Sequence, residues 1–75
     1  MSIDQIREAQ PVQNSIHDLI QTLSVKLDSA ARYGLYQEDA KEDGFDDCAA
    51  LFGRLAEQER GAIDELTGCL RDHLA

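Results

Sequence analysis

The sequence EDGFDD at residues 42–47 decides the fold of this 75-residue chain, because it separates two long stretches of helical periodicity. Gly44 provides the left-handed backbone conformation with which helices commonly end. Asp46 and Asp47 then place negative charge in the first turn of a following helix, where it interacts favourably with the helix dipole. The sequence therefore predicts one helix on each side of a short turn.

The stretch before the turn carries apolar or small residues at alternating steps of four and three, which is typical of a helix with one packed face. Ser15, followed three residues later by Asp18, is a capping-box variant that predicts the helix start. We expect a helix over residues 14–41, after an N-terminal tail or short helix at residues 1–13. The expected seam contains Ile16, Ile20, Leu23, Leu27, Ala30 and Gly34, and Leu19, Tyr33 and Leu35 widen it.

The stretch after the turn has the same periodicity and predicts a helix over residues 45–73. Its stripe reads Phe45, Cys48, Phe52, Leu55, Glu59, Ala62, Leu66, Cys69 and His73, flanked by Ala49, Ala56, Ile63 and Leu70. A short loop between two long helices makes them antiparallel neighbours. The expected fold of residues 14–75 is therefore all-α, an antiparallel helical hairpin.

The charge balance limits the classes of partner. Acidic residues outnumber basic ones by 15 to 7, and the formal net charge is −8. Nucleic-acid and anionic-membrane surfaces need clustered Lys and Arg, so we expect neither partner. No apolar run approaches the ~20 residues of a membrane span, and the N-terminus has no signal-peptide pattern. Two cysteines without a secretory context indicate a reduced, cytoplasmic chain.

Each apolar stripe is wider than the contact between two helices can cover. A monomer would leave a large apolar patch in water, which monomeric proteins rarely tolerate. Two copies pairing into a four-helix bundle would cover it, so we expect a homodimer; burial against a different protein is the alternative. The expected interface residues are Leu19, Leu23, Leu27, Phe52, Leu55, Ile63 and Leu66.

Glu59 is the unusual residue in the second stripe, because a carboxylate among apolar side chains needs a partner, a proton or a metal. Lys26 lies on the edge of the first seam at about the same height. Three interpretations remain open at this point: a Lys26–Glu59 ion pair in the bundle centre, a peripheral placement that reaches solvent, and metal ligation by Glu59.

Four segments resemble the first helical hairpin of a rubrerythrin-like, ferritin-like domain. They are RYGLY at residues 32–36, AKEDGF at 40–45, ALF at 50–52 and AEQE at 56–59. The resemblance covers roughly residues 26–66. In that family each hairpin supplies a Glu seven residues before the tyrosine and a Glu-x-x-His pair on the next helix, and two hairpins close a di-iron site.

The chain departs from this pattern at the ligand positions. Lys26 stands seven residues before Tyr33, and Ala62 stands three residues after Glu59, where a histidine is expected. The resemblance therefore implies a ferritin-like four-helix bundle without the standard iron site or a cofactor. We expect a non-catalytic assembly or protein-binding module. The alternative is an iron-binding oxidoreductase whose displaced ligands, such as Glu59, Glu57 and Asp28, are shared across the dimer.

Other groups of residues give weaker signals. Cys69 and His73 are four residues apart on one helix face, which is half of a soft-metal site. Cys48 lies about 31 Å from Cys69 along the helix at the standard rise, so only a partner chain with its second helix antiparallel could bring the two together. Buried apolar cysteines explain them more simply. We find no arrangement for nucleophilic catalysis and name no catalytic residue.

Three glycines, Gly53, Gly61 and Gly68, fall on the side of the second helix opposite its apolar stripe. Each costs a helix interior roughly 0.8–1 kcal/mol relative to alanine. An exposed face offset by dimer packing explains them, and so does a second interface at which another helix approaches the backbone closely.

Overall fold

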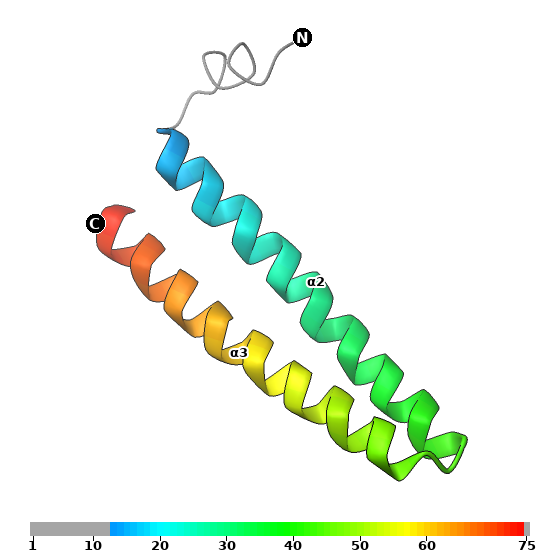
Figure 1. Ribbon diagram of the computed structural model, residues 1–75. Coiled ribbons are helices and arrows are strands. Elements are labelled where there is room, and N and C mark those ends of the chain that lie inside the picture. Colours follow the sequence, from blue (N-terminus) through cyan, green and yellow to red (C-terminus); the bar gives the residue numbers. More distant parts are fainter. Residues whose placement is uncertain (1–12, 75) are drawn as a thin grey trace, which may run out of the picture.

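Two long helices joined by a tight turn make up residues 13–74, the part that the computed structural model describes (Figure 1). Helix α2 spans Asn14–Glu42 and helix α3 spans Asp46–Leu74, each with 29 residues. The helices run antiparallel, side by side. The predicted all-α antiparallel hairpin is therefore confirmed. The expected tail or short helix at residues 1–13 falls, apart from Gln13, outside the described residues.

The turn closes α2 with the hydrogen bonds of a Schellman motif. The backbone N–H of Phe45 donates to the Ala40 carbonyl over 2.9 Å, and the N–H of Gly44 donates to the Lys41 carbonyl over 3.1 Å. Gly44 has a φ of 75°, so it adopts the predicted left-handed conformation. Asp46 and the residue after it lie in the first turn of α3, as predicted.

The start of α2 differs from the capping box that the sequence suggested. Gln13 is the N-cap residue, with an extended backbone and no side-chain capping hydrogen bond. Ser15 is the second residue of the helix and not its N-cap. Only at the N-cap would its hydroxyl be placed to accept a hydrogen bond from a backbone N–H of the first turn. The Ser15–Asp18 prediction is therefore wrong, although the helix begins at Asn14 as expected.

Small side chains are the most buried residues between the helices. The buried residues in the described part are Ile16, Ala40, Ala49 and Ala56, and no large side chain there is fully buried. Alanines let two helix backbones approach closely, but each buries little apolar area. The hairpin by itself therefore has a thin core.

The seam is rotated from the one that the periodicity predicted. Ile20 and Leu27 are 48% and 52% exposed, whereas the neighbouring row that contains Leu19, Lys26 and Tyr33 is half-buried. On α3 the alanines expected to flank the stripe are its most buried members. Large apolar residues lie on both sides of the observed contact between α2 and α3. The sequence pattern reflects these large residues and not the alanines at which the helices meet.

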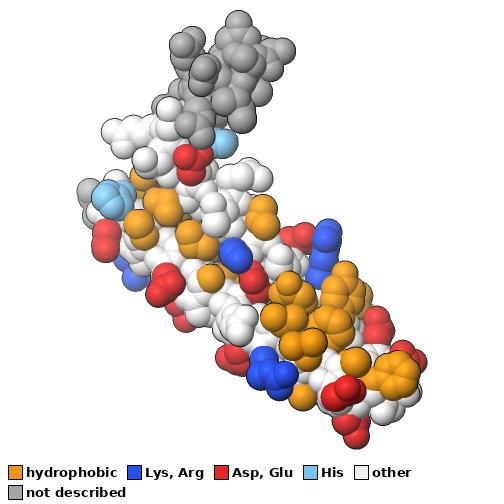
Figure 2. Space-filling model, in the orientation of Figure 1, with side chains coloured by type: hydrophobic (Ala, Val, Ile, Leu, Met, Phe, Trp, Pro, Cys, Tyr) orange, Lys and Arg blue, Asp and Glu red, His pale blue; other side chains and the backbone are white. Residues whose placement is uncertain are grey.

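Exposed apolar side chains consequently lie on two faces of the hairpin. Val25 (54% exposed) and Leu27 are about 200° apart around α2 at 100° per residue, so they flank the seam on opposite sides. We call the side of Val25 the aromatic face. Tyr36, 11 residues after Val25, lies on the same side of α2 at 100° per residue, and its ring contacts Phe52 of α3. By the same spacing the α3 residues on the side of Phe52 are Cys48, Leu55, Leu66 and Cys69. Hydrophobic side chains of both helices gather on the face seen in Figure 2, most densely toward the turn.

The two ends of the hairpin differ in charge. The end with the turn, residues 38–47, is called the tip and carries six acidic residues and one lysine, all exposed. The open end, residues 13–20 and 69–74, carries one arginine, two aspartates and two histidines. The net negative charge is therefore concentrated at the tip.

Candidate functional site

A charged pair joins the two helices near the middle of the hairpin. Lys26 on α2 donates from Nζ to Glu59 Oε1 on α3 over 3.3 Å. The Glu59 side chain is only 14% exposed, whereas that of Lys26 is 37% exposed. Both residues occupy positions in the seam, so the structure contains the inward ion pair that was one of the three interpretations of the sequence.

The second oxygen of the Glu59 carboxylate is buried and accepts no hydrogen bond within the described residues. An unsatisfied buried acceptor costs about 1–3 kcal/mol. Lys26 therefore compensates only part of the cost of placing Glu59 in the seam. This asymmetry makes Glu59 depend on Lys26 more than Lys26 depends on Glu59.

The displaced ligands proposed for an iron site are engaged elsewhere. Asp28 pairs with Arg32 over 3.1 Å on the surface of α2, and Glu57 pairs with Arg60 on the surface of α3. Among residues 13–74, no three His, Cys, Asp or Glu side chains come together in a way that could hold a metal ion. A metal shared between copies would require a partner chain to complete the ligand set at Glu59.

Aromatic rings of the two helices pack against each other between the Lys26–Glu59 pair and the tip. The ring centroids of Tyr36 and Phe52 are 5.5 Å apart in an edge-on arrangement, and Tyr33 stacks on Phe52 at 6.3 Å. Gln37 adds a polar link, donating from Nε2 to the Ala49 carbonyl over 3.2 Å. Gln37 was not predicted from the sequence, although it lies four residues after Tyr33 and so on the same side of α2.

A hollow of about 260 Å³ opens at the tip beside these rings. Tyr36, Phe45 and Phe52 line it together with Asp39, Asp43, Ala40 and Cys48. Burial raises the pKa of the Cys48 thiol, and the charge and hydrogen bonding of Asp47 raise it further. The thiol is therefore kept neutral at pH 7 and is a poor nucleophile.

We expect Asp47→Asn to accelerate the alkylation of Cys48 by iodoacetamide several-fold at about pH 8. Losing the neighbouring negative charge lowers the pKa of the thiol and raises the thiolate fraction. The introduced amide would retain a side-chain oxygen to accept from the Cys48 N–H, as Asp47 does over 2.9 Å. Peptide mass spectrometry gives the Cys48 rate in both proteins, and N-acetylcysteine added to each reaction serves as the internal control. An unchanged Cys48 rate would show that burial alone raises its pKa.

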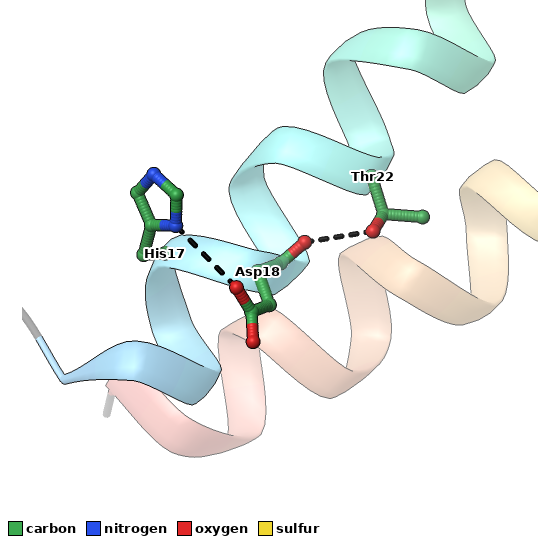
Figure 3. A network of polar contacts seen from close by, with 3 residues as sticks. All are labelled: His17, Asp18 and Thr22. Atoms are coloured by element: carbon green, nitrogen blue, oxygen red, sulfur yellow. Dashed lines mark hydrogen bonds and ion pairs between the residues drawn. The ribbon is translucent and has the colours of Figure 1, made fainter. Parts of the chain in front are cut away.

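A second hollow, of about 410 Å³, lies between the helices at the open end. Cys69 and His73 both line it, so they share a face as their spacing indicates, and Asp18 and Thr22 line it from α2. Figure 3 shows the polar contacts at its edge: the Thr22 hydroxyl donates to the Asp18 carbonyl over 2.7 Å. His17 Nδ1 lies 3.4 Å from Asp18 Oδ1.

The three glycines of α3 do not share one environment. A Cβ built on Gly53 would lie 2.7 Å from Nε2 of Gln37, so this glycine makes room for a side chain of α2. Around Gly61 and Gly68 nothing lies within 4 Å of such a Cβ. A second interface, if the glycines form one, therefore centres on Gly61 and Gly68.

The seven residues expected at the dimer interface are divided by the rotated seam. Leu27 is 52% exposed, and the other six, Leu19, Leu23, Phe52, Leu55, Ile63 and Leu66, are half-buried. Phe52, Leu55 and Leu66 belong to the aromatic face, whereas Leu27 lies on the opposite flank. The structure therefore brings only part of the predicted interface to one surface.

No protein family, curated protein or solved structure matches the chain in comparisons with known proteins. The rubrerythrin-like resemblance consequently stays a prediction. Neither α2 nor α3 has the combined length and apolar character of a membrane-spanning helix.

Proposed function

We propose that the protein is a non-catalytic, ferritin-like homodimeric helical bundle that acts as an assembly or protein-binding module. The observation that carries this proposal is the apolar surface that the hairpin leaves in water. Val25, Leu51 and Phe45 are 54%, 45% and 57% exposed on or beside the aromatic face. Contiguous exposed apolar patches of this kind mark interaction sites in soluble proteins.

The thin core supports the same proposal. Four buried residues, three of them alanines, provide little hydrophobic stabilisation within the hairpin. Domains of this size with a small core depend on oligomerisation, metals or disulfides for stability. Both cysteines of this chain are free in the structure, so a second chain is the source of stability that we propose.

The Lys26–Glu59 pair argues for a structural role of the bundle centre. A Lys26 ammonium occupies the position at which the resemblance would place a metal ligand, and its positive charge meets the Glu59 carboxylate directly. An iron-binding oxidoreductase would instead need ligands from both copies around Glu59. The iron content of the purified protein distinguishes the non-catalytic bundle, which we propose, from an iron-binding oxidoreductase.

Two measurements test the proposed function. Sedimentation equilibrium over a dilution series should give about twice the 8.3 kDa of one chain. Iron analysis after anaerobic Fe(II) loading and desalting should give close to none per chain. A monomer at all concentrations would contradict the homodimer and favour a different protein as partner. About one iron per chain would contradict the non-catalytic assignment.

A further inference from the structure

We infer that the second copy packs antiparallel on the aromatic face, so that the tip of each hairpin lies over the open end of the other. This inference rests on the proposed homodimer and specifies its geometry. A two-fold axis perpendicular to the helices near Glu59 generates the arrangement. The same surface then meets itself, as a two-fold interface requires.

The charge distribution selects this direction. The tip carries six exposed acidic residues and one lysine, whereas the open end carries Asp18, Arg71 and Asp72 as its charged residues besides two histidines. A parallel pair would bring two acidic tips together. An antiparallel pair separates them by about 40 Å, the length of a 29-residue helix, which is several Debye lengths at physiological salt.

The pattern on α3 fits the same axis. Cys48 lies 11 residues before Glu59 and Cys69 lies 10 residues after it, and the apolar positions between them are spaced similarly on both sides. Rotation about an axis near Glu59 therefore places Cys48 of one copy opposite Cys69 of the other. No parallel arrangement does so, because each cysteine would then lie near its own equivalent.

The shape of the face agrees with this pairing. The hollow at the open end, which Ile16 and Leu19 line, offers an apolar surface. Phe45 is 57% exposed at the tip. In an antiparallel pair, the open-end hollow of the other copy would lie against this tip. Neither hollow is filled by side chains of residues 13–74, and each lies at the end of the face where the other copy would cover it.

Cross-linking of two single-cysteine variants tests the direction. Cys48→Ser and Cys69→Ser are each purified, then mixed in equal amounts, unfolded and refolded together, and treated with a short bismaleimide. We expect cross-linked dimer in the mixture only, up to about half of the chains if they exchange at random. N-ethylmaleimide labelling of each variant sets the reaction time, and sedimentation confirms that each remains dimeric.

The outcomes separate this inference from the function on which it rests. Cross-linking within each variant alone would show a parallel pair and overturn the inference while leaving the homodimer. Dimeric mass without any cross-link would also overturn it, because another face would then form the interface. Monomeric mass would overturn both.

Discussion

Leu55→Glu is expected to convert the dimer into monomers at concentrations at which the wild-type chain is dimeric. Leu55 is half-buried on the aromatic face of α3, four residues before Glu59. A second copy on this face would bury the new carboxylate without a partner, which is costly. We expect the dissociation constant to rise about 100-fold, or about 2.7 kcal/mol, measured by sedimentation equilibrium.

Leu27→Glu is the matched control. It makes the same change of side chain and charge on a residue that is 52% exposed, but on the opposite flank of α2. The dimer should survive this substitution with a dissociation constant within a few-fold of wild type. If Leu27→Glu dissociates the chains and Leu55→Glu does not, the interface lies on the other face of the hairpin. Circular dichroism of both variants checks that the helices persist.

The elements of the fold were predictable because local chemistry determines them. Gly44 adopts the conformation that few other residues tolerate, and the turn it forms satisfies the last carbonyls of α2. The rotation of the seam was not predictable from the same pattern. On α2 the expected row, with Ile20 and Leu27, and the half-buried row, with Lys26, have the same helical periodicity. The buried contacts of the two helices are instead at Ala40, Ala49 and Ala56, whose small side chains permit close backbone approach.

The candidate site was predictable in part for a similar reason. A glutamate in an apolar stripe requires compensation, and Lys26 was the cation at the matching height, so the sequence indicated the ion pair as one of three interpretations. The sequence did not predict that the Glu59 side chain is more deeply buried than the Lys26 side chain. This difference depends on the rotation of the seam, which places Glu59 deeper than Lys26. The environment of Gly53 was missed for the same reason, since Gln37 is brought beside it only in the packed hairpin.

Lys26→Met is expected to lower the free energy of unfolding by about 2 kcal/mol, whereas Glu59→Met should change it by less than about 1 kcal/mol. Removing Lys26 leaves the Glu59 carboxylate, whose side chain is 14% exposed, without its cation, and one of its oxygens already accepts no hydrogen bond from residues 13–74. Removing Glu59 leaves Lys26, whose 37% exposed side chain can extend its ammonium group to water. Methionine fills a similar volume at both positions.

The double variant Lys26→Met/Glu59→Met separates the pair from its surroundings. With both charges gone, neither desolvation cost remains, so its stability should equal or exceed that of the wild type. Urea unfolding at one fixed chain concentration, followed by circular dichroism, compares the four proteins, because a dimer's stability depends on concentration. Equal and small effects of the two single variants would contradict the unequal burial. A double variant less stable than the wild type would contradict this expectation, because the charged pair would then stabilise the bundle more than an apolar centre does.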